Sequence, residues 1–179
     1  MKRINVIGTS GSRKTTFSRK LARKLDLAYI ELDELFWLDD WKESSNEIFF
    51  EKLKNRMDRL EPQGYVIDGN YTRTQAIKWK NIDTVIWLDF PFYLNLIQSV
   101  KRTVIRLISQ EKLWSNSDNK ETLSNALSRD SIILWMIKTH AKNRKKYSVL
   151  INDPRYSHIR FIRLRSRKQT RKFLADVNI

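Results

Sequence analysis

Residues 8–16 read Gly8-Thr9-Ser10-Gly11-Ser12-Arg13-Lys14-Thr15-Thr16. A short apolar segment, 4–7, precedes them, and a helical pattern, 17–25, follows them. Strand, glycine-containing turn, Lys-Thr and helix form the context that a phosphate-binding loop requires. Glycines let backbone N–H groups turn inward around an anion, and the following helix adds its positive N-terminal end. We therefore expect Lys14 to reach the β- and γ-phosphates of a nucleotide and the Thr15 hydroxyl to hold Mg²⁺.

The loop departs from the pattern G-x-x-x-x-G-K-[ST] at position 13, where Arg13 replaces the second glycine. If this position needs a positive φ, a non-glycine residue adds about 1–3 kcal/mol of strain. A guanidinium is, however, itself a good phosphate ligand. The alternative is a turn that only resembles a phosphate loop. We predict a distorted loop in the free protein, with Arg13 pointing to solvent or pairing with an acid.

The composition sets the limits of the interpretation. The chain has 179 residues, which suits one domain, 1–179, with a real core. Its net charge of +15 favours nucleotides, nucleic acid or acidic membrane surfaces and does not choose among them. Cysteine is absent, so disulfides and thiolate metal sites are excluded. Without a signal-peptide pattern or a membrane-spanning apolar run, we expect a cytoplasmic protein with no membrane partner.

Strand and helix patterns alternate along the chain, which predicts an α/β fold around a parallel sheet. The expected strands are 4–7, 28–32, 65–67, 83–89 and 159–164. The expected helices are 15–25, 46–60, 91–108, 121–128, 130–147 and one from about 168.

Three carboxylates stand where strands end, at Asp33, Asp68 and Asp89. The carboxyl ends of parallel strands line the crevice where ligands bind. Asp33 is a candidate for Mg²⁺-water or substrate contact, and a helix N-cap before 34–36 explains it equally well. A turn capped by its own carboxylate would explain Asp68 before Gly69. We favour function there because Asp33 and Asp68 take the same position on different strands, while Asp89 resembles a Walker B acid and a metal ligand.

Two further segments carry candidate side chains for a substrate pocket. Residues 36–46 hold Phe36, Trp37 and Trp41, which form either an aromatic wall over the pocket or ordinary packing under a loop. Residues 110–120 are polar and read as a mobile excursion.

The last candidates are lid residues that follow the excursion. Arg129 is the strongest lid candidate, because it precedes an apolar helix. The basic end of that helix, 142–146, is either part of a lid or a solvated end favoured by the helix dipole.

The chain resembles the adenylate-kinase-related P-loop proteins, and in particular the FlaR-like "DNA topology modulation" group. The matching segments are 8–12 with Lys14-Thr15, Glu31-Leu32-Asp33 with Leu35-Phe36-Trp37, 66–71, 83–89, Ser128-Arg129-Asp130-Ser131 and Arg163-Leu164-Arg165-Ser166. The resemblance implies a three-layer P-loop kinase fold, whose five-stranded parallel sheet has the order 2-3-1-4-5. Helices would cover both faces, with a helical lid over about 92–147.

The same resemblance implies the ligands and the residues that bind them. ATP would lie on the loop, at Gly8, Ser10, Gly11, Ser12, Arg13, Lys14, Thr15 and Thr16. By likeness to nucleoside monophosphate kinases, Asp33 and Asp68 would face Mg²⁺ and the acceptor, and Arg129 the transferring phosphate. Arg165 would lie near the adenine.

We expect an ATP-dependent phosphotransferase that acts on a small, nucleotide-like acceptor. Lys14, Asp33, Asp68 and Arg129 are its predicted catalytic residues, and Thr15, Asp33, Asp68 and Asp89 are its predicted Mg²⁺ ligands. One alternative is a nucleic-acid-binding regulator, because residues 142–172 hold twelve basic residues and one acid. Another is a nucleotide-binding protein without turnover, disabled at Arg13. The chain is expected to be a monomer or a homodimer.

Overall fold

The computed structural model describes residues 1–114, 117–128 and 131–177. Its strands are β1 (Arg3–Gly8), β2 (Ala28–Glu31), β3 (Tyr65–Asp68), β4 (Thr84–Leu88) and β5 (Arg160–Leu164). Its α-helices are α1 (Lys14–Lys24), α2 (Leu32–Phe36), α3 (Asn46–Leu60), α4 (Gln75–Lys78), α5 (Phe92–Ser109), α6 (Leu123–Leu127), α7 (Ile132–Leu150) and α8 (Arg167–Asp176). Short 3₁₀ turns lie at Asp39–Trp41, Thr72–Thr74 and Pro154–Tyr156.

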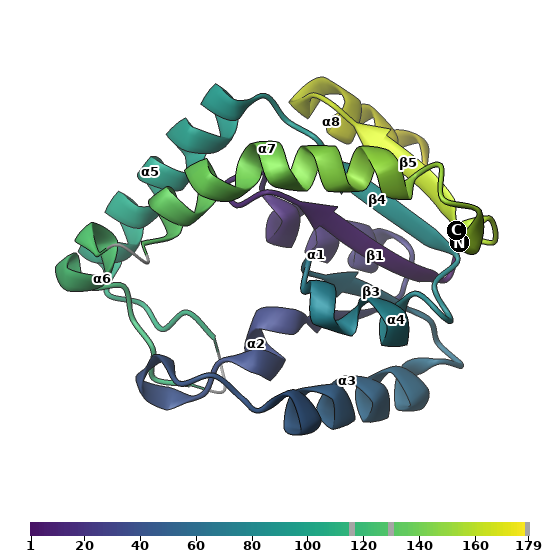
Figure 1. Cartoon of the computed structure of the whole chain (residues 1–179), viewed down its shortest axis with the longest axis horizontal. Helices are drawn as coiled ribbons and strands as arrows, with labels where there is room; N and C mark the ends of the chain where they lie inside the picture. The colour runs from purple at the N-terminus through teal and green to yellow at the C-terminus, as the bar shows by residue number, and fades with distance from the viewer. Residues whose placement is uncertain (115–116, 129–130, 178–179) are drawn as a thin grey trace.

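The strands form one parallel sheet in the order β2-β3-β1-β4-β5, which confirms the predicted order (Figure 1). β1 lies in the centre and pairs with β3 on one side and with β4 on the other. Val6 is opposite Asp68 in β3, and Gly8 is opposite Leu88 in β4. The phosphate-loop candidate therefore leaves the middle of the sheet, between the ends of β3 and β4.

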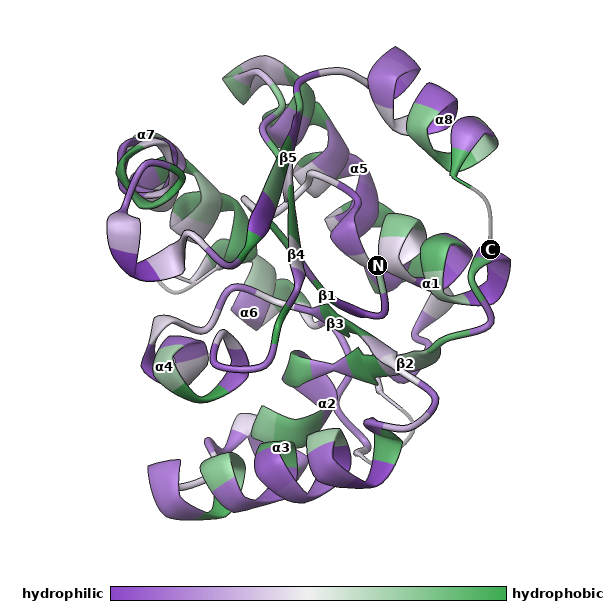
Figure 2. Cartoon of the chain, turned by 90° about the vertical axis from the view of Figure 1, so that its right-hand side faces the viewer, coloured by the Kyte–Doolittle hydropathy of each residue, from purple (hydrophilic) through white to green (hydrophobic). Residues whose placement is uncertain are grey.

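Helices cover both faces of this sheet (Figure 2). α1 and α8 pack on one face, where Phe17, Leu21 and Phe173 meet apolar side chains of β1, β3 and β4. α3, α4 and α7 cover the other face, where Phe49, Trp79, Tyr147 and their neighbours form the larger core. This is the three-layer arrangement that alternating strands and helices predict.

Serine side chains fix where several helices begin. Ser45 Oγ accepts from the backbone N–H of Ile48 at the start of α3, and Ser166 Oγ accepts from that of Gln169 at the start of α8. Such caps satisfy backbone donors that have no partner inside the helix. The prediction for β2 was wrong at Leu32, which begins α2 instead. None of the helices described is long and apolar enough to cross a membrane.

Candidate functional site

The centre of the site is the first turn of α1. Lys14 begins the helix, and its Nζ lies 3.4 Å from the carbonyl oxygen of Thr9 in the preceding loop. The Thr15 hydroxyl donates to Asp68 Oδ2 at 2.6 Å, and Thr16 is exposed beside it. The first N–H groups of a helix have no partner within it, so they are available to an anion together with the lysine. The sequence-predicted residues Lys14, Thr15 and Asp68 are thus brought together.

Asp68 is buried, with 4% of its surface exposed. Burial raises the pKa of Asp68 to about 6, although the charge of Lys14 and the hydrogen bond from Thr15 favour the ionised form. Burial also lowers the pKa of Lys14, against the opposite influence of Asp68 and Asp33. Asp68 Oδ1 is buried and has no hydrogen-bond partner. A buried carboxylate oxygen without a partner costs folding free energy, and a ligand that contacts this oxygen would remove that cost.

Tyr29 and Glu31 extend this carboxylate cluster, and sequence reasoning missed both. The Tyr29 hydroxyl lies 3.2 Å from Asp68 Oδ2 and 2.9 Å from Glu31 Oε2. Arg19, one turn after Thr15 on α1, pairs with the same Glu31 oxygen at 2.9 Å. The sequence did offer a sign of this, because Tyr29 and Glu31 are two positions apart in β2 and therefore lie on the same face of this edge strand.

Asp33 takes a different position from the one that a helix cap would give it. It is the second residue of α2, whose N-cap position is Glu31 with no side-chain cap, so the N-cap interpretation was wrong. Asp33 Oδ1 accepts from the Tyr71 hydroxyl at 2.7 Å. This bond leaves the other carboxylate oxygen of Asp33 for further contacts, next to the turn that follows β3.

The turn after β3 also fixes the start of the loop. The Asn70 amide accepts from Gly8 N at 2.9 Å through Oδ1 and donates to Gly8 O at 2.8 Å through Nδ2. Lys78, which has no exposed surface, donates to the carbonyl oxygens of Gly69 and Asn70. Burial lowers the pKa of Lys78 to about 7. Two-point contact with a backbone peptide restrains both position and orientation, so Asn70 sets where the loop begins.

Arg13 occupies the N-cap position of α1 with φ 61° and ψ 33°, in the left-handed region. Position 13 thus does need the positive φ that favours glycine. Arg13 is exposed, as one of the two predicted alternatives has it, and its partner is an amide instead of an acid, because its Nε and Nη2 donate to Gln98 Oε1 at 3.0 and 2.8 Å. Gly11 lies against α5, because a Cβ at Gly11 would meet the Asn95 carbonyl oxygen and Ser99 Oγ.

Two arginines of α5, Arg102 and Arg106, reach the same region, and sequence reasoning assigned neither of them to the site. Arg102 Nη2 donates to Ser10 Oγ at 2.9 Å, and its buried Nε has no partner. Burial and the neighbouring Arg106 lower the pKa of Arg102 to about 10. The negative charge of Asp33 acts in the opposite direction and favours the charged form of both arginines, which raises their pKa. The spacing of 102 and 106 after the fourth strand was the available signal.

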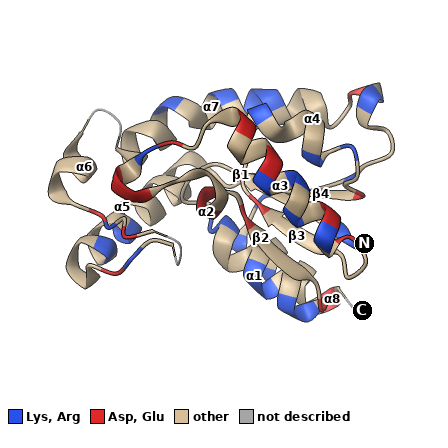
Figure 3. Cartoon of the chain, turned by 90° about the horizontal axis from the view of Figure 1, so that it is seen from below, with Lys and Arg blue, Asp and Glu red and all other residues tan. Residues whose placement is uncertain are grey.

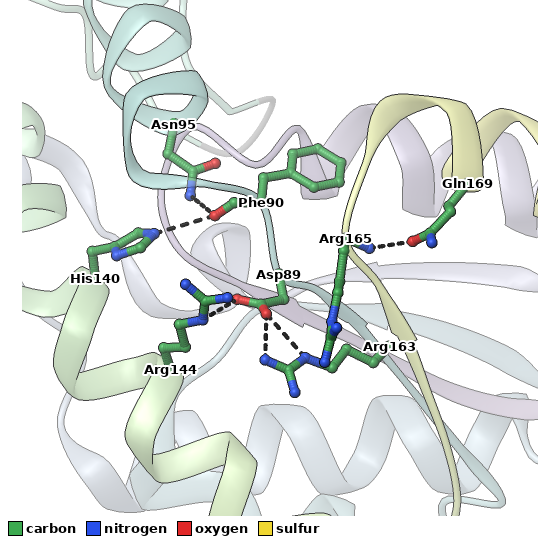
Figure 4. Close-up of polar contacts among 8 residues, drawn as sticks. All are labelled: Asp89, Phe90, Asn95, His140, Arg144, Arg163, Arg165 and Gln169. Carbon is green, nitrogen blue, oxygen red and sulfur yellow. Dashed lines mark hydrogen bonds and ion pairs between the residues drawn. The ribbon is translucent and has the colours of Figure 1, made fainter.

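Asp89 is not drawn into this cluster. Its Oδ2 accepts from Arg163 Nε and Nη2 at 2.9 and 2.6 Å, and its Oδ1 pairs with Arg144 Nε at 3.3 Å (Figure 4). Both oxygens are therefore taken by guanidinium groups, and the structure gives the Walker B resemblance no support. Arg165 is exposed, and its backbone N–H donates to Gln169 Oε1 at 2.6 Å. Arg129 lies outside the described residues.

The aromatic residues divide between the core and the edge of the site. Phe36 is buried in the core, so packing explains it. Trp37 and Trp41 are half-buried, and their ring centroids lie 6.4 and 5.8 Å from that of Trp114. Asn119 holds the two segments together, because it donates to Leu38 O and accepts from Trp41 N. The described part of 110–120, predicted as a mobile excursion, is therefore hydrogen-bonded to 38–41.

A cavity of about 750 Å³ opens on the outer side of the edge strand β2. Tyr29 and Glu31 line it from the sheet, Arg19 from α1 and Trp114 from the opposite segment. Lys14 and Thr15 do not line it, so the cavity lies beside the first turn of α1 rather than over it.

We tested whether these residues fit a nucleotide with Mg²⁺. Polar atoms left without partners include Asp68 Oδ1, Ser12 Oγ and Arg102 Nε, all next to the loop. Among the described residues no three His, Cys, Asp or Glu side chains are grouped to hold a metal ion alone. Mg²⁺ commonly takes one or two carboxylates and completes its shell with phosphate and water. Thr15 and Asp68 therefore fit an ion that arrives with a nucleotide.

The basic residues do not gather at one element. In Figure 3, Lys and Arg positions appear on α1, α3 and α7, and red acidic positions lie among them. On the part of the chain that is described, the basic positions are thus spread over several helices.

Solved structures with a similar fold include a sugar kinase and two shikimate kinases. An unliganded sugar kinase from Janibacter sp. HTCC2649 is 15% identical, with a TM-score of 0.54 over 98% of this chain and 93% of that one. Shikimate kinase from Bacteroides thetaiotaomicron is 15% identical, with a TM-score of 0.50 over 97% and 94%. Shikimate kinase from Acinetobacter baumannii, in complex with shikimate, is 14% identical, with a TM-score of 0.51 over 98% and 89%. The chain thus has a kinase-like P-loop fold.

No family model and no curated protein sequence matches this chain. At these identities the structural likeness extends to the fold alone.

Proposed function

We propose that this protein binds ATP with Mg²⁺ and transfers a phosphoryl group to a small, nucleotide-like acceptor. The observation that carries the proposal is the grouping of Lys14, Thr15 and a buried, incompletely bonded Asp68 at the free N-terminal end of α1. Proteins catalyse phosphoryl transfer mainly by positioning the reactants and neutralising the charge of the phosphates. The fold of the sugar and shikimate kinases is consistent with this chemistry.

Each group of residues has its own proposed role. The N–H groups of 11–16 and the Lys14 ammonium bind the phosphates, for which Ser12 N gives up its 3.1 Å hydrogen bond to Thr9 O. Arg102 and Arg106 neutralise charge from the α5 side. Thr15 and Asp68 hold Mg²⁺, which supplies charge neutralisation and orientation when it is bound. Arg129 is proposed as a further lid arginine.

The acceptor is proposed to lie between 33–41 and 68–73. Asp33 would orient its hydroxyl or phosphate, and Tyr71 holds the Asp33 carboxylate in place at 2.7 Å. Arg73 lies 4.7 Å over the Phe36 ring at the edge of this region and contacts Glu43 at 3.8 Å and Asn46 Oδ1 at 3.0 Å, so an anionic acceptor would share or replace these partners. Asp33→Asn and Asp68→Asn are each expected to lower turnover about 100-fold or more. Unchanged turnover of the true acceptor in both variants would show that the assignment is wrong.

A second candidate function, nucleotide binding without turnover, is favoured by one observation. Arg13 holds a left-handed conformation in place of glycine, and its side chain is tied to Gln98 on α5. This geometry adds strain and bulk where the backbone of a phosphate loop passes close to phosphate. Measuring ATP hydrolysis and acceptor phosphorylation beside ATP binding separates the two functions.

The test of the nucleotide site is a calorimetric ATP titration of the protein and of Arg13→Gly, at one salt and Mg²⁺ concentration. The glycine variant is expected to bind more tightly by about 1–3 kcal/mol, or about 5- to more than 100-fold. Glycine removes both the strain and the side chain, which is the physical reason for the gain.

Gln98→Ala is the matched control for this titration. It releases the Arg13 guanidinium and leaves the left-handed backbone in place, so it isolates the hydrogen bond from the strain. A gain in Arg13→Gly alone assigns the loss to strain and bulk. Equal affinities, or tighter binding by the arginine form, would identify Arg13 as a phosphate ligand. No ATP binding by any of the three proteins refutes the nucleotide site.

A further inference from the structure

The turn that follows β3, residues 69–71, is held by buried donors from two other elements. Lys78, the last residue of α4, donates through Nζ to the carbonyl oxygens of Gly69 and Asn70 at 3.2 and 3.3 Å. Asn5 of β1 shares the Gly69 oxygen, to which its Nδ2 donates at 3.2 Å. Neither Lys78 nor Asn5 has any exposed surface. Two buried side chains therefore hold the backbone of this turn.

Asn5 is itself fixed by its neighbours. Its Oδ1 accepts from the Trp79 indole N–H at 2.9 Å, and its Nδ2 also donates to the Ile67 carbonyl oxygen at 3.1 Å. Trp79 follows Lys78 directly in the chain and packs edge-on against Tyr156, with ring centroids 4.8 Å apart. Asn5, Lys78 and Trp79 thus form one network, which we call the α4 network. A satisfied buried network of this kind fixes one arrangement of the backbone that it contacts.

The side chains of the same turn contact two parts of the proposed site. The Asn70 amide bonds to both backbone groups of Gly8, at 2.9 and 2.8 Å. Tyr71, the next residue, donates to Asp33 Oδ1 at 2.7 Å. Gly8 begins the phosphate-loop candidate, and Asp33 is the residue proposed to orient the acceptor. Because Asn70 and Tyr71 are consecutive, one turn sets the two positions relative to each other.

Lysine is a costly choice for position 78. Moving an ammonium group out of water costs folding free energy, and Lys146 of α7 acts on Lys78 with a charge of the same sign. Burial lowers the pKa of Lys78 to about 7, and the neutral amine still has two N–H groups for the two carbonyl oxygens. An apolar side chain of similar length would avoid the cost but would leave both oxygens without this donor. What lysine adds here is therefore its N–H donors to the turn.

We propose that Lys78 is a positioning residue, which through the turn 69–71 fixes the start of the phosphate loop relative to Asp33. The inference deepens the proposed function and rests on it. Lys78 has no exposed surface, so it acts through Asn70 and Tyr71 instead of touching a ligand. Misplacing a reacting group by about 1 Å can lower a rate about 100-fold, so a defined loop start matters for phosphoryl transfer.

Amide hydrogen exchange, followed by NMR in the unliganded protein, tests the hold on the loop. Lys78→Met keeps the length of the side chain and removes its donors. It is expected to speed exchange of the Gly8 N–H about tenfold, because the turn that carries Asn70 loosens, while the amides of β4 keep their rates. Lys146→Met is the matched control. It removes a lysine that donates to Thr72 Oγ1 at 2.7 Å, just beyond the turn, and should leave Gly8 exchange unchanged.

Calorimetric titration with ATP and Mg²⁺ tests the role in the site. Lys78→Met and Asn70→Ala are each expected to weaken ATP binding about tenfold, and Lys146→Met to leave it unchanged. The double variant of Lys78 and Asn70 should bind no more weakly than Asn70→Ala alone, because both changes break the same link to Gly8. A purely structural role would change the free energy of unfolding and leave the affinity for ATP as it is.

Unchanged Gly8 exchange in Lys78→Met overturns the proposal, and so does faster exchange with unchanged ATP affinity. Additive losses in the double variant overturn it too, since Lys78 would then act by another route. Trp79→Phe removes the indole donor to Asn5 and should shift both readouts in the same direction. If Lys78→Met does not fold, unchanged readouts in Trp79→Phe overturn the proposal. If the unaltered protein binds no ATP, the proposed function fails, and the exchange readout still decides whether Lys78 holds the loop.

Discussion

Asp68 and Asp89 stand at the ends of the two strands that flank β1, and their surroundings are opposite in kind. Asp68 ends β3 beside Lys14, Thr15 and Tyr29, and one of its oxygens has no partner. Asp89 follows β4, and both of its oxygens are bound by guanidinium groups of Arg163 and Arg144. Asp68 thus lacks a hydrogen-bond partner on one oxygen, whereas both oxygens of Asp89 have partners.

The difference shows what a strand-end position does and does not determine. Both aspartates are at least 95% buried, so burial alone does not separate them. Two arginines neutralise Asp89, which makes it a structural link between β4, β5 and α7. Asp68 faces a lysine whose own pKa is lowered by burial, so the pair is poised to bind a further charged group. Of the two, the arrangement around Asp68 is the one that suits a metal or phosphate ligand.

The largest expected effect concerns Asp89. Asp89→Asn leaves Arg163 and Arg144 without their anion, and removing one member of a buried ion pair is strongly destabilising. We expect the free energy of unfolding to fall by about 3 kcal/mol, at the lower end of the usual range because Arg144 is half-exposed. Urea unfolding at pH 7 measures the change. In the same experiment Asp68→Asn should leave the free energy of unfolding unchanged or raise it. An equal loss of unfolding free energy in both variants would contradict the difference drawn between Asp68 and Asp89.

The second expected effect is the pH dependence that Asp68 contributes. Its pKa is about 6 in the folded protein against 3.8 ordinarily, so the folded state holds the proton more tightly. The contribution to stability is therefore complete below pH 3.8 and is lost as the pH rises through about 6. Relative to Asp68→Asn, the protein should lose about 2 kcal/mol of stability between pH 4 and pH 7. Parallel curves of unfolding free energy against pH for the two proteins would contradict this.

The smallest expected effect separates the two arginines that hold Asp89. The Arg144 side chain is 50% exposed and makes one 3.3 Å contact, whereas Arg163 is 26% exposed and makes two short ones. Arg163 also lies 4.2 Å over the Trp87 ring. Arg144→Gln should cost less than about 1 kcal/mol of unfolding free energy, and Arg163→Gln distinctly more. Denaturant unfolding of the two variants side by side checks the order.

Local sequence features were enough to predict the elements and much of the loop. The apolar run 4–7 before Gly8, and Lys14-Thr15 after it, predicted strand, turn and helix, and β1 and α1 lie there. Asp33 and Asp68 were predicted to lie in the ligand crevice because both follow strands, and Asp68 accepts a hydrogen bond from Thr15 next to the loop. These features could be predicted because hydrophobic periodicity and backbone chemistry act between near neighbours in the chain. The sheet order 2-3-1-4-5 followed from the family resemblance, and the structure confirms it.

By itself, then, the sequence determined the α/β fold and the position of the phosphate-loop candidate, whereas the positive φ at Arg13 came from the structure. Tertiary structure alone decided which strand-end acid stays incomplete, because Arg144 and Arg163 come from α7 and β5, far from Asp89 in the chain. It also decided that Arg13 meets Gln98, that Asn70 fixes Gly8 and that α5 turns its polar side inward. Such pairings depend on how helices pack over the sheet, and the side-chain pattern of one segment does not identify the distant residues that this segment will contact.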